Sequence, residues 1–173
     1  ILIGRKGYSQ GNNTGRAVLY LGDTGTTGIG SKHWESSPTG TNSEFGKHVS
    51  NAGDINGDGC ADFLVAAPNE DDTNQSDEGR VRLYYGAPSN FSSAPRDSIA
   101  TGISGDQNGS AVALIGDING DGYDEVAVGA PYYDNGNTNE GAVFIYQGTA
   151  TGIDPTVVTI LEPDSDDARF GAS

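Results

Sequence analysis

Oxygen-bearing side chains recur at alternate positions of a short glycine-rich segment, residues 54–62, called here the first loop. Carboxylate or amide oxygens stand at its positions 1, 3, 5 and 9, and the backbone carbonyl of position 7 is available as well. Glycines at positions 4 and 6 permit sharp turns, so alternate residues can converge on one point. Calcium takes about six to eight oxygen ligands from flexible loops of this kind. The candidate ligands are Asp54, Asn56, Asp58, the Cys60 carbonyl and Asp62.

The same pattern returns 63 residues later in the second loop, residues 117–125, whose first six residues are identical to those of the first loop. Clusters of Asp, Asn and Gly also form ordinary turns between strands, which is the alternative interpretation. Two copies in register favour a metal site over that alternative. The second loop carries a longer carboxylate at position 9, and its candidate ligands are Asp117, Asn119, Asp121, the Tyr123 carbonyl and Glu125.

Other metal sites fit the two loops less well. Magnesium demands near-octahedral geometry and usually keeps several waters. Zinc prefers His or thiolate ligands, and a cysteine whose carbonyl faces an ion turns its thiol away. An EF-hand needs a Glu at position 12 and flanking helices, whereas this chain has Val65 and Val128 at that position. We therefore predict calcium sites held between strands.

The composition favours an all-β fold. Gly supplies 27 of 173 residues, Met is absent and charged residues make up only 19%, a balance that favours turns and short strands over helices. The net charge of −15 repels nucleic acid and anionic membrane surfaces, so we expect neither as a partner. No apolar run approaches 18 residues, and we expect no direct membrane insertion. A single cysteine rules out a disulfide within the chain.

The two loops belong to a longer repeat. Residues 79–86 and 141–148 match each other, and residues 15–22 supply a third copy. A Phe-Gly pair opens each following unit, although one of the three is degraded. These pairs are Phe45-Gly46, Asn108-Gly109 and Phe170-Gly171.

Short strands bounded by Gly, Pro, Asn or Asp fill each unit. Residues 63–67 and 126–130 are apolar on both faces, which predicts central strands packed between neighbouring sheets. Residues 80–84 alternate, as expected of a strand with one wetter side. Weaker strands are predicted at 98–103 and 156–161. Four strands per unit favour a β-propeller of four-stranded antiparallel blades, and a parallel β-helix, whose rungs are typically shorter, is the alternative.

We expect one domain, residues 1–173, made of successive blades. A closed propeller normally needs about four to eight blades, so we expect further copies or chains to complete this one. The predicted divisions are a partial blade (1–44), two complete blades (45–105 and 106–165) and the start of a further blade (166–173).

Three landmarks that recur in order resemble FG-GAP repeats: Phe45-Gly46, the metal loop, and Ala66-Ala67-Pro68 or Gly129-Ala130-Pro131. The likeness covers nearly the whole chain. In integrin α-subunits such repeats form a seven-bladed propeller with calcium loops on one face and partner-binding loops on the other. The resemblance therefore implies seven blades when complete, calcium at the matching loop positions, and a role in adhesion or assembly. Departures from the pattern are Asn108, Glu125 and Ala66.

We expect a non-catalytic, calcium-binding module for adhesion or for interaction with a protein or glycan ligand, outside the cell or at its surface. Extracellular calcium, at about a millimolar, fills even weak sites of this kind. The chain contains no nucleophile elbow, Cys/His nucleophile pattern or phosphate loop. The alternatives are an accessory propeller of a secreted enzyme whose catalytic residues lie outside this chain, and a structural subunit of an extracellular filament. Candidate recognition loops are the connectors 69–78 and 132–140, the latter with Tyr132 and Tyr133.

Overall fold

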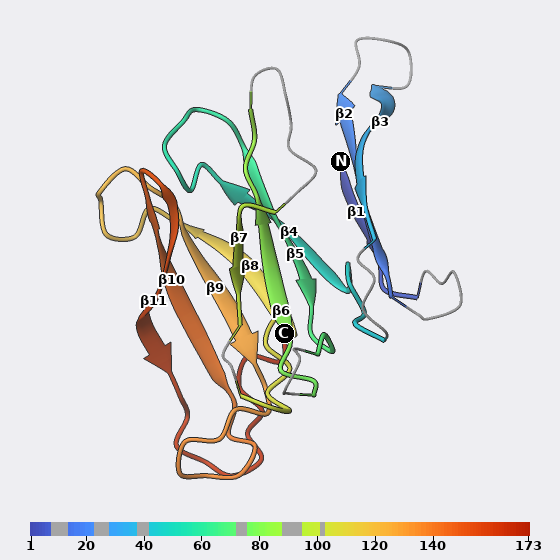
Figure 1. Ribbon diagram of the computed structural model, residues 1–173. Coiled ribbons are helices and arrows are strands. Elements are labelled where there is room, and N and C mark those ends of the chain that lie inside the picture. The colour runs from blue at the N-terminus through green and yellow to red at the C-terminus, as the bar shows by residue number, and fades with distance from the viewer. Residues whose placement is uncertain (8–13, 23–27, 38–41, 72–75, 88–94, 101–102) are drawn as a thin grey trace.

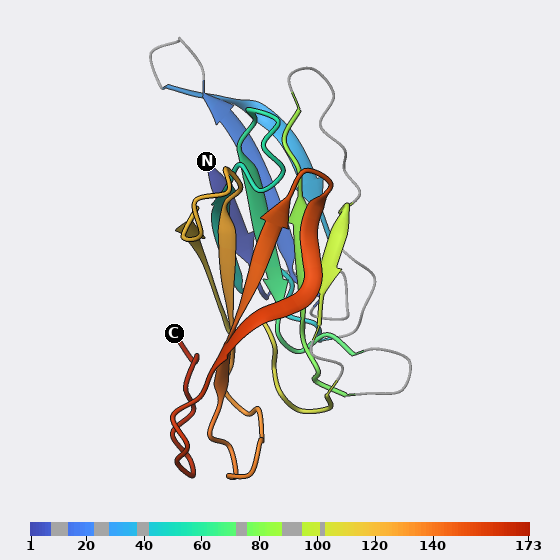
Figure 2. The same ribbon diagram turned by 90° about the vertical axis from the view of Figure 1, so that its left-hand side faces the viewer.

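Three antiparallel β-sheets stand side by side in the computed structural model (Figures 1 and 2). The structure describes residues 1–7, 14–22, 28–37, 42–71, 76–87, 95–100 and 103–173. These ranges contain strands and no helix, which confirms the all-β prediction. The strands are β1 (Leu2–Arg5), β2 (Arg16–Gly22), β3 (Ile29–Ser36), β4 (His48–Gly53), β5 (Asp62–Ala67), β6 (Arg80–Tyr84), β7 (Asp97–Ile99), β8 (Ala111–Gly116), β9 (Glu125–Ala130), β10 (Ala142–Thr149) and β11 (Gly152–Leu161).

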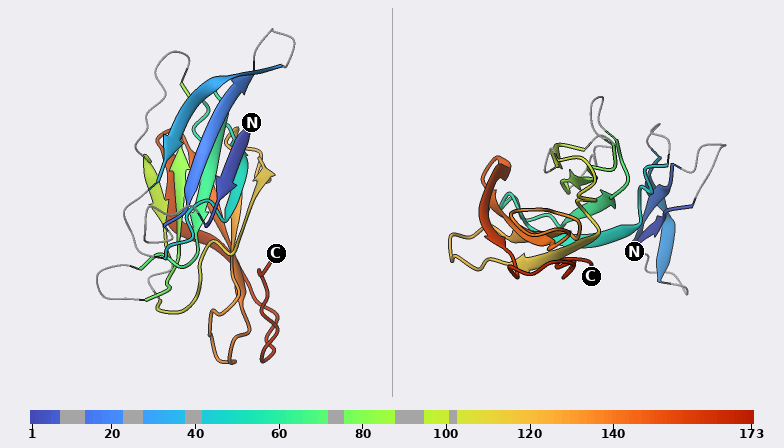
Figure 3. Two further views of the ribbon diagram at one scale, coloured as in Figure 1. Left: turned by 90° about the vertical axis from the view of Figure 1, so that its right-hand side faces the viewer. Right: turned by 90° about the horizontal axis from the view of Figure 1, so that it is seen from below.

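Each sheet is a meander in which consecutive strands are neighbours. The first sheet has the order β1-β2-β3, the second β4-β5-β6-β7 and the third β8-β9-β10-β11. Seen from below, the sheets follow one another in sequence order, as successive blades of a propeller do (Figure 3). The four-stranded antiparallel architecture is therefore confirmed. The division of the chain into numbered units, and the total number of blades, remain predictions.

The observed strand limits differ from the expected ones at the outer edges of the sheets. The central strands β5 and β9 match the predicted ranges to within one residue, and every residue of β5 is buried. Strand β7 covers only Asp97–Ile99, and residues 101–102 of the predicted strand lie outside the described residues. Strand β11 begins at Gly152, earlier than predicted, because a tight turn places Gly152 opposite Thr149 and lets pairing with β10 start at once.

Alternate residues of β5 serve two separate cores. Leu64 and Ala66 belong to the core shared with the third sheet, which includes Val126 and Val128. Phe63, Val65 and Ala67 belong to the core shared with the first sheet. A strand that is apolar on both faces can satisfy both neighbours, because successive side chains point to opposite sides of a sheet.

An aromatic cluster fills the core between the first and second sheets. The ring of Trp34 meets those of Phe63 and Tyr84 edge to face, at centroid distances of 5.0 and 4.6 Å. An edge-to-face arrangement is favourable because it places the positive edge of one ring against the negative face of the other. Trp34 is buried in this cluster and is therefore part of the core.

The segments that open successive units are attached to the preceding sheet in the same way. The backbone N–H of Phe45 donates to the Thr14 carbonyl at 3.1 Å, and the N–H of Phe170 donates to the Glu140 carbonyl at 2.9 Å. The N–H of Asn108 makes the equivalent bond to the Glu78 carbonyl at 2.9 Å. The degraded Asn-Gly pair therefore occupies the structural position of Phe-Gly.

Candidate metal centre

Both candidate loops lie between the first and second strands of a four-stranded sheet. The first loop joins β4 to β5, and the second loop joins β8 to β9. A hairpin position of this kind fixes the two ends of the loop, because both flanking strands belong to one hydrogen-bonded sheet. The loop itself is free to wrap its oxygen atoms around a point.

The first loop is folded by hydrogen bonds from its own backbone to its candidate ligands. The Asp54 carboxylate accepts the N–H groups of Asp58 and Gly59 at 2.9 and 2.8 Å. Asp58 in turn accepts the N–H of Cys60 at 2.8 Å, and Asn56 Oδ1 accepts that of Asp58 at 3.1 Å. Gly59 has φ +84°, a left-handed conformation that glycine adopts without strain.

The second loop repeats this arrangement. The Asp117 carboxylate accepts the N–H groups of Asp121 and Gly122 at 3.0 and 2.9 Å. Asn119 Oδ1 accepts the N–H of Asp121 at 2.9 Å, and Asp121 Oδ1 accepts that of Tyr123 at 3.0 Å. The side chains at positions 1, 3 and 5 are thus gathered in both copies. Asp117 Oδ1 also accepts the N–H of Gly120, at 2.7 Å, whereas its Oδ2 accepts one N–H and keeps a lone pair for a cation. The donor set therefore suits calcium.

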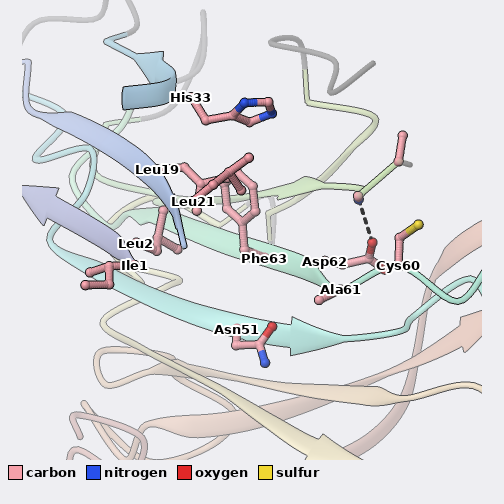
Figure 4. Close-up of a pocket in the computed structure, with 12 residues that line it drawn as sticks. Ile1, Leu2, Leu19, Leu21, His33, Asn51, Cys60, Ala61, Asp62 and Phe63 are labelled. Atoms are coloured by element: carbon pink, nitrogen blue, oxygen red, sulfur yellow. Dashed lines mark hydrogen bonds between the residues drawn. The ribbon is translucent and has the colours of Figure 1, made fainter. Parts of the chain in front are cut away.

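The carboxylate at position 9 is buried in each loop and bonds to the backbone. Asp62 accepts the N–H of Ile55 at 2.9 Å and that of Gly86 at 2.8 Å (Figure 4). Glu125 accepts the N–H of Ile118 at 2.9 Å. The longer Glu therefore reaches the same loop amide as Asp, and the substitution preserves the local structure.

Burial raises the pKa of Asp62 to about 6. The N–H donors of Gly86 and Ile55 lower this pKa, while the negative charges of Asp58 and Asp54 raise it. The carboxylates of the first loop thus repel one another in a partly desolvated place. A bound divalent cation would offset this repulsion, since an opposite charge favours the ionised form.

The two position-7 residues have different surroundings. The Cys60 side chain lines an apolar cavity between the first and second sheets (Figure 4), and the role of its carbonyl as a ligand stays a prediction. The Tyr123 ring lies against Gly57, where an added Cβ would be only 2.8 Å from the ring. The second loop therefore supports the first.

Asp124 contacts the first loop from the next sheet, and the sequence analysis did not identify this contact. Its Oδ2 accepts the N–H of Asp54 at 2.9 Å, and its own N–H donates to the Asp54 carbonyl at 3.4 Å. Position 8 holds Asp124 in the second loop but Ala61 in the first. That difference was visible in the sequence, but its meaning depends on the contact between sheets.

A separate cluster of acidic side chains lies at the end of the third sheet away from the two candidate loops. Carboxylate oxygens of Glu140, Glu162 and Asp164 come within 4.8 Å of one another. The buried Glu140 carboxylate accepts the N–H of Asn135 at 2.7 Å and the side-chain amide of Asn137 at 3.2 Å. The buried Glu140 carboxylate therefore stabilises the fold of the connector through these bonds.

The connector tyrosines take part in local contacts. The Tyr133 ring meets Phe144 edge to face at 5.1 Å, and the Arg169 guanidinium lies 5.3 Å from the centre of the Tyr132 ring. Both tyrosines are half-buried. In the other connector, residues 72–75 lie outside the described residues.

The family model for the FG-GAP repeat matches residues 45–84 and 108–146. The chain carries FG-GAP repeats. Each match begins at a unit-opening pair or at its Asn108 equivalent and includes one complete candidate loop. The FG-GAP assignment therefore agrees with the repeat found in the sequence and with the equivalent backbone bonds of Phe45 and Asn108.

Several integrin α-chains are similar to this FG-GAP chain. Human integrin alpha-6 is 33% identical over 156 residues, which cover 90% of this chain and 13% of the relative. Mouse integrin alpha-IIb is 36% identical over 138 residues (76% and 13%), and integrin alpha-4 of Xenopus laevis is 34% identical over 155 residues (87% and 14%). The chain thus spans about one seventh of the length of these relatives. Among the described residues, no helix has the length and hydropathy needed to cross a bilayer.

Proposed function

We propose that the chain is a non-catalytic FG-GAP module that binds calcium through its two loops and serves in adhesion outside the cell or at its surface. The observation that carries the calcium proposal is the repeated gathering of oxygen donors at positions 1, 3 and 5 around a turn whose backbone is already folded. The proposed ligands are those predicted from the sequence, namely Asp54, Asn56, Asp58, Cys60 and Asp62 in the first loop and Asp117, Asn119, Asp121, Tyr123 and Glu125 in the second.

The similarity to integrin α-chains supports the adhesion role and the extracellular location. Calcium would act there by stabilising the fold, because a ligand that binds only the native state shifts the equilibrium by mass action. The proposed partner is a protein or glycan. Exposed acids on the connector and on the segment after β11, namely Asp134, Asp164, Asp166 and Asp167, favour a protein partner with basic side chains.

Thermal unfolding with calcium and with chelator tests the proposed metal. We expect saturating calcium to raise the Tm by about 5–10 °C, because calcium at a hundred times its Kd adds about 2.7 kcal/mol of stability. The double variant Asp58→Asn, Asp121→Asn should lose most of this shift. Asp154→Asn makes the same type of substitution once, outside the loops, and should keep the shift. An identical Tm in calcium and chelator would refute the calcium proposal.

A further inference from the structure

The sequence contains four Asn-Gly pairs, which begin at Asn56, Asn108, Asn119 and Asn135. The backbone nitrogen of the glycine in such a pair can attack the asparagine side chain, because glycine has no side chain of its own to hinder the approach. The pairs at Asn56 and Asn119 lie in the same hexapeptide, Asp-Ile-Asn-Gly-Asp-Gly, one in each loop. A difference in reactivity between these two pairs must therefore come from the fold.

In the first loop the attacking group is free and its target is activated. The N–H of Gly57 has no hydrogen-bond partner among the described residues. Asn56 Oδ1 accepts the N–H of Asp58 at 3.1 Å, and this donor stabilises the negative charge that develops on the oxygen during attack. Gly57 is exposed, so water reaches the pair.

In the second loop the corresponding N–H group is occupied. Gly120 donates it to Asp117 Oδ1 at 2.7 Å. A hydrogen bond to a carboxylate is roughly twice as strong as a bond between neutral groups, and it must break before the Gly120 nitrogen can attack. The target is set as in the first loop, since Asn119 Oδ1 accepts the N–H of Asp121 at 2.9 Å. The two loops thus match at the target and differ at the attacking nitrogen.

The other two pairs are placed less favourably for this reaction. Asn108 is fully buried, and the N–H of Gly109 donates to the Gly129 carbonyl at 3.0 Å. The side-chain amide of Asn135 donates to both carboxylate oxygens of Glu162, at 3.2 and 3.0 Å. No described N–H group donates to the Asn135 side-chain oxygen, which therefore lacks the activation found in the loops.

We propose that Asn56-Gly57 is the preferred site of spontaneous deamidation in this protein, because it alone of the four pairs combines a free glycine N–H with an activated side-chain carbonyl. The Gly57 nitrogen forms a bond to the Asn56 side-chain carbon Cγ, and the bond from Cγ to Nδ2 breaks. The amide NH2 group leaves with the Gly57 proton as ammonia, and a cyclic succinimide remains. Water then opens the ring at either carbonyl, which gives aspartate or isoaspartate at position 56.

Both products change the first loop. The Asn56 amide donates to Asp58 Oδ2 at 3.1 Å, and its conversion to a carboxylate replaces this bond with repulsion between two negative charges. Isoaspartate also adds an atom to the backbone, where the Tyr123 ring leaves little room, since a Cβ on Gly57 would lie 2.8 Å from that ring. Deamidation therefore disturbs the contact between the second and third sheets. This inference goes beyond the proposed calcium role and needs no bound ion.

Incubation of the full chain in mildly alkaline buffer with chelator tests the proposal, and mass spectrometry of its peptides locates each modified asparagine. We expect Asn56 to convert at least roughly tenfold faster than Asn119, because only the reaction at Asn119 first breaks a hydrogen bond to a carboxylate. Asn135 should convert more slowly than Asn56, and Asn108 should stay unmodified. In urea the two identical hexapeptides should convert at equal rates, because the unfolded chain no longer distinguishes them.

Two matched variants separate the effect of the free N–H from a general loosening of the loop. Asp54 and Asp117 accept corresponding pairs of loop N–H groups, but only Asp117 also accepts the N–H of Gly120. Asp117→Ala should therefore accelerate the conversion of Asn119 by a factor roughly tenfold larger than that by which Asp54→Ala accelerates the conversion of Asn56.

Three results would overturn the proposal. The first is a folded chain in which Asn119 or Asn135 converts as fast as Asn56. The second is a difference between the two loops that persists in urea, and the third is equal acceleration by the two alanine variants. Because the chelator keeps both loops free of metal, these outcomes do not depend on the calcium melts, and the two proposals fail separately.

Discussion

At the scale of single residues, Asn108 is the clearest mismatch between a side chain and its surroundings. Its backbone takes the place that Phe45 and Phe170 take in the neighbouring repeats. The side chain is fully buried, yet neither its amide nitrogen nor its amide oxygen has a hydrogen-bond partner among the described residues. A buried polar group without a partner keeps its desolvation cost, about 1–3 kcal/mol. Asn108 therefore lowers the stability of the joint between the second and third sheets.

Replacing Asn108 with leucine, which is close to asparagine in size and shape, should stabilise the protein. We expect Asn108→Leu to raise the free energy of unfolding by about 1–3 kcal/mol, because it removes both unpaired polar atoms from the interior. Urea denaturation measures this change. Asn135→Leu is the matched control: its amide donates to Glu162 at 3.0 Å, so it should give no gain. Equal stabilisation by both variants would contradict this interpretation.

At the scale of elements, local sequence was enough to predict that alternate side chains of the two loops converge, because the folding of these loops depends on bonds between near neighbours. Asp54 reaches N–H groups four and five residues away, and Gly59 takes the left-handed turn that its type permits. The bonds of Asp62 to Gly86 and of Asp124 to Asp54 could not be predicted in this way. They join residues far apart in the sequence, and they exist only after the strands and sheets have come together.

In both four-stranded sheets a glycine precedes the third strand: Gly79 before β6 and Gly141 before β10. Gly79 can be used to test whether this position requires glycine. Its φ is +76°, and a Cβ there would lie 2.2 Å from the carbonyl oxygen of Asn108. Gly105 has a similar φ, +89°, but nothing within 4 Å of its Cβ position. In both alanine variants the strain of a left-handed backbone at a residue with a Cβ should lower the free energy of unfolding by roughly 1 kcal/mol.

Gly79→Ala should therefore destabilise the protein by at least about 2 kcal/mol more than Gly105→Ala, because the backbone of the next unit has to move away. Chemical denaturation of the two variants, compared with the unmodified chain, gives the difference directly. If the two alanine variants were equally stable, close contact between units could not be the reason for this glycine.

At the scale of the whole molecule, the repeat predicted the fold class because each unit reproduces one sheet. Residues 63–67 indicated this fold class, because a strand that is apolar on both faces needs a neighbouring sheet on each side. Strand β5 has a sheet on both sides. The shortness of β7 and the early start of β11 depend on pairing at the outer edges, where side-chain patterns are weak. The cavity beside β1 was not predictable, because it depends on which strands lie next to one another.

Two buried tyrosines, Tyr85 and Tyr146, lie in the core between the second and third sheets and make the stability of the whole molecule depend on alkaline pH. Burial raises the pKa of Tyr146 from 10 to about 12. Burial likewise raises the pKa of Tyr85, and the nearby Asp97 carboxylate raises it further. In the unfolded chain these phenols ionise near pH 10, whereas the folded protein keeps them neutral. The unfolded state therefore loses protons first as the pH rises.

The free energy of unfolding should consequently be fully retained below about pH 10 and fall above it. Tyr146 alone accounts for a loss of about 3 kcal/mol between pH 10 and 12, since one pKa unit corresponds to about 1.4 kcal/mol. Urea denaturation at a series of pH values, with tyrosinate absorbance recorded in parallel, measures the fall. Tyr146→Phe has no ionisable phenol and should show a shallower decline, even though it is a buried aromatic of nearly the same size. A decline of unchanged steepness in that variant would mean that other groups drive alkaline unfolding and that the core around Tyr146 admits water before the sheets separate.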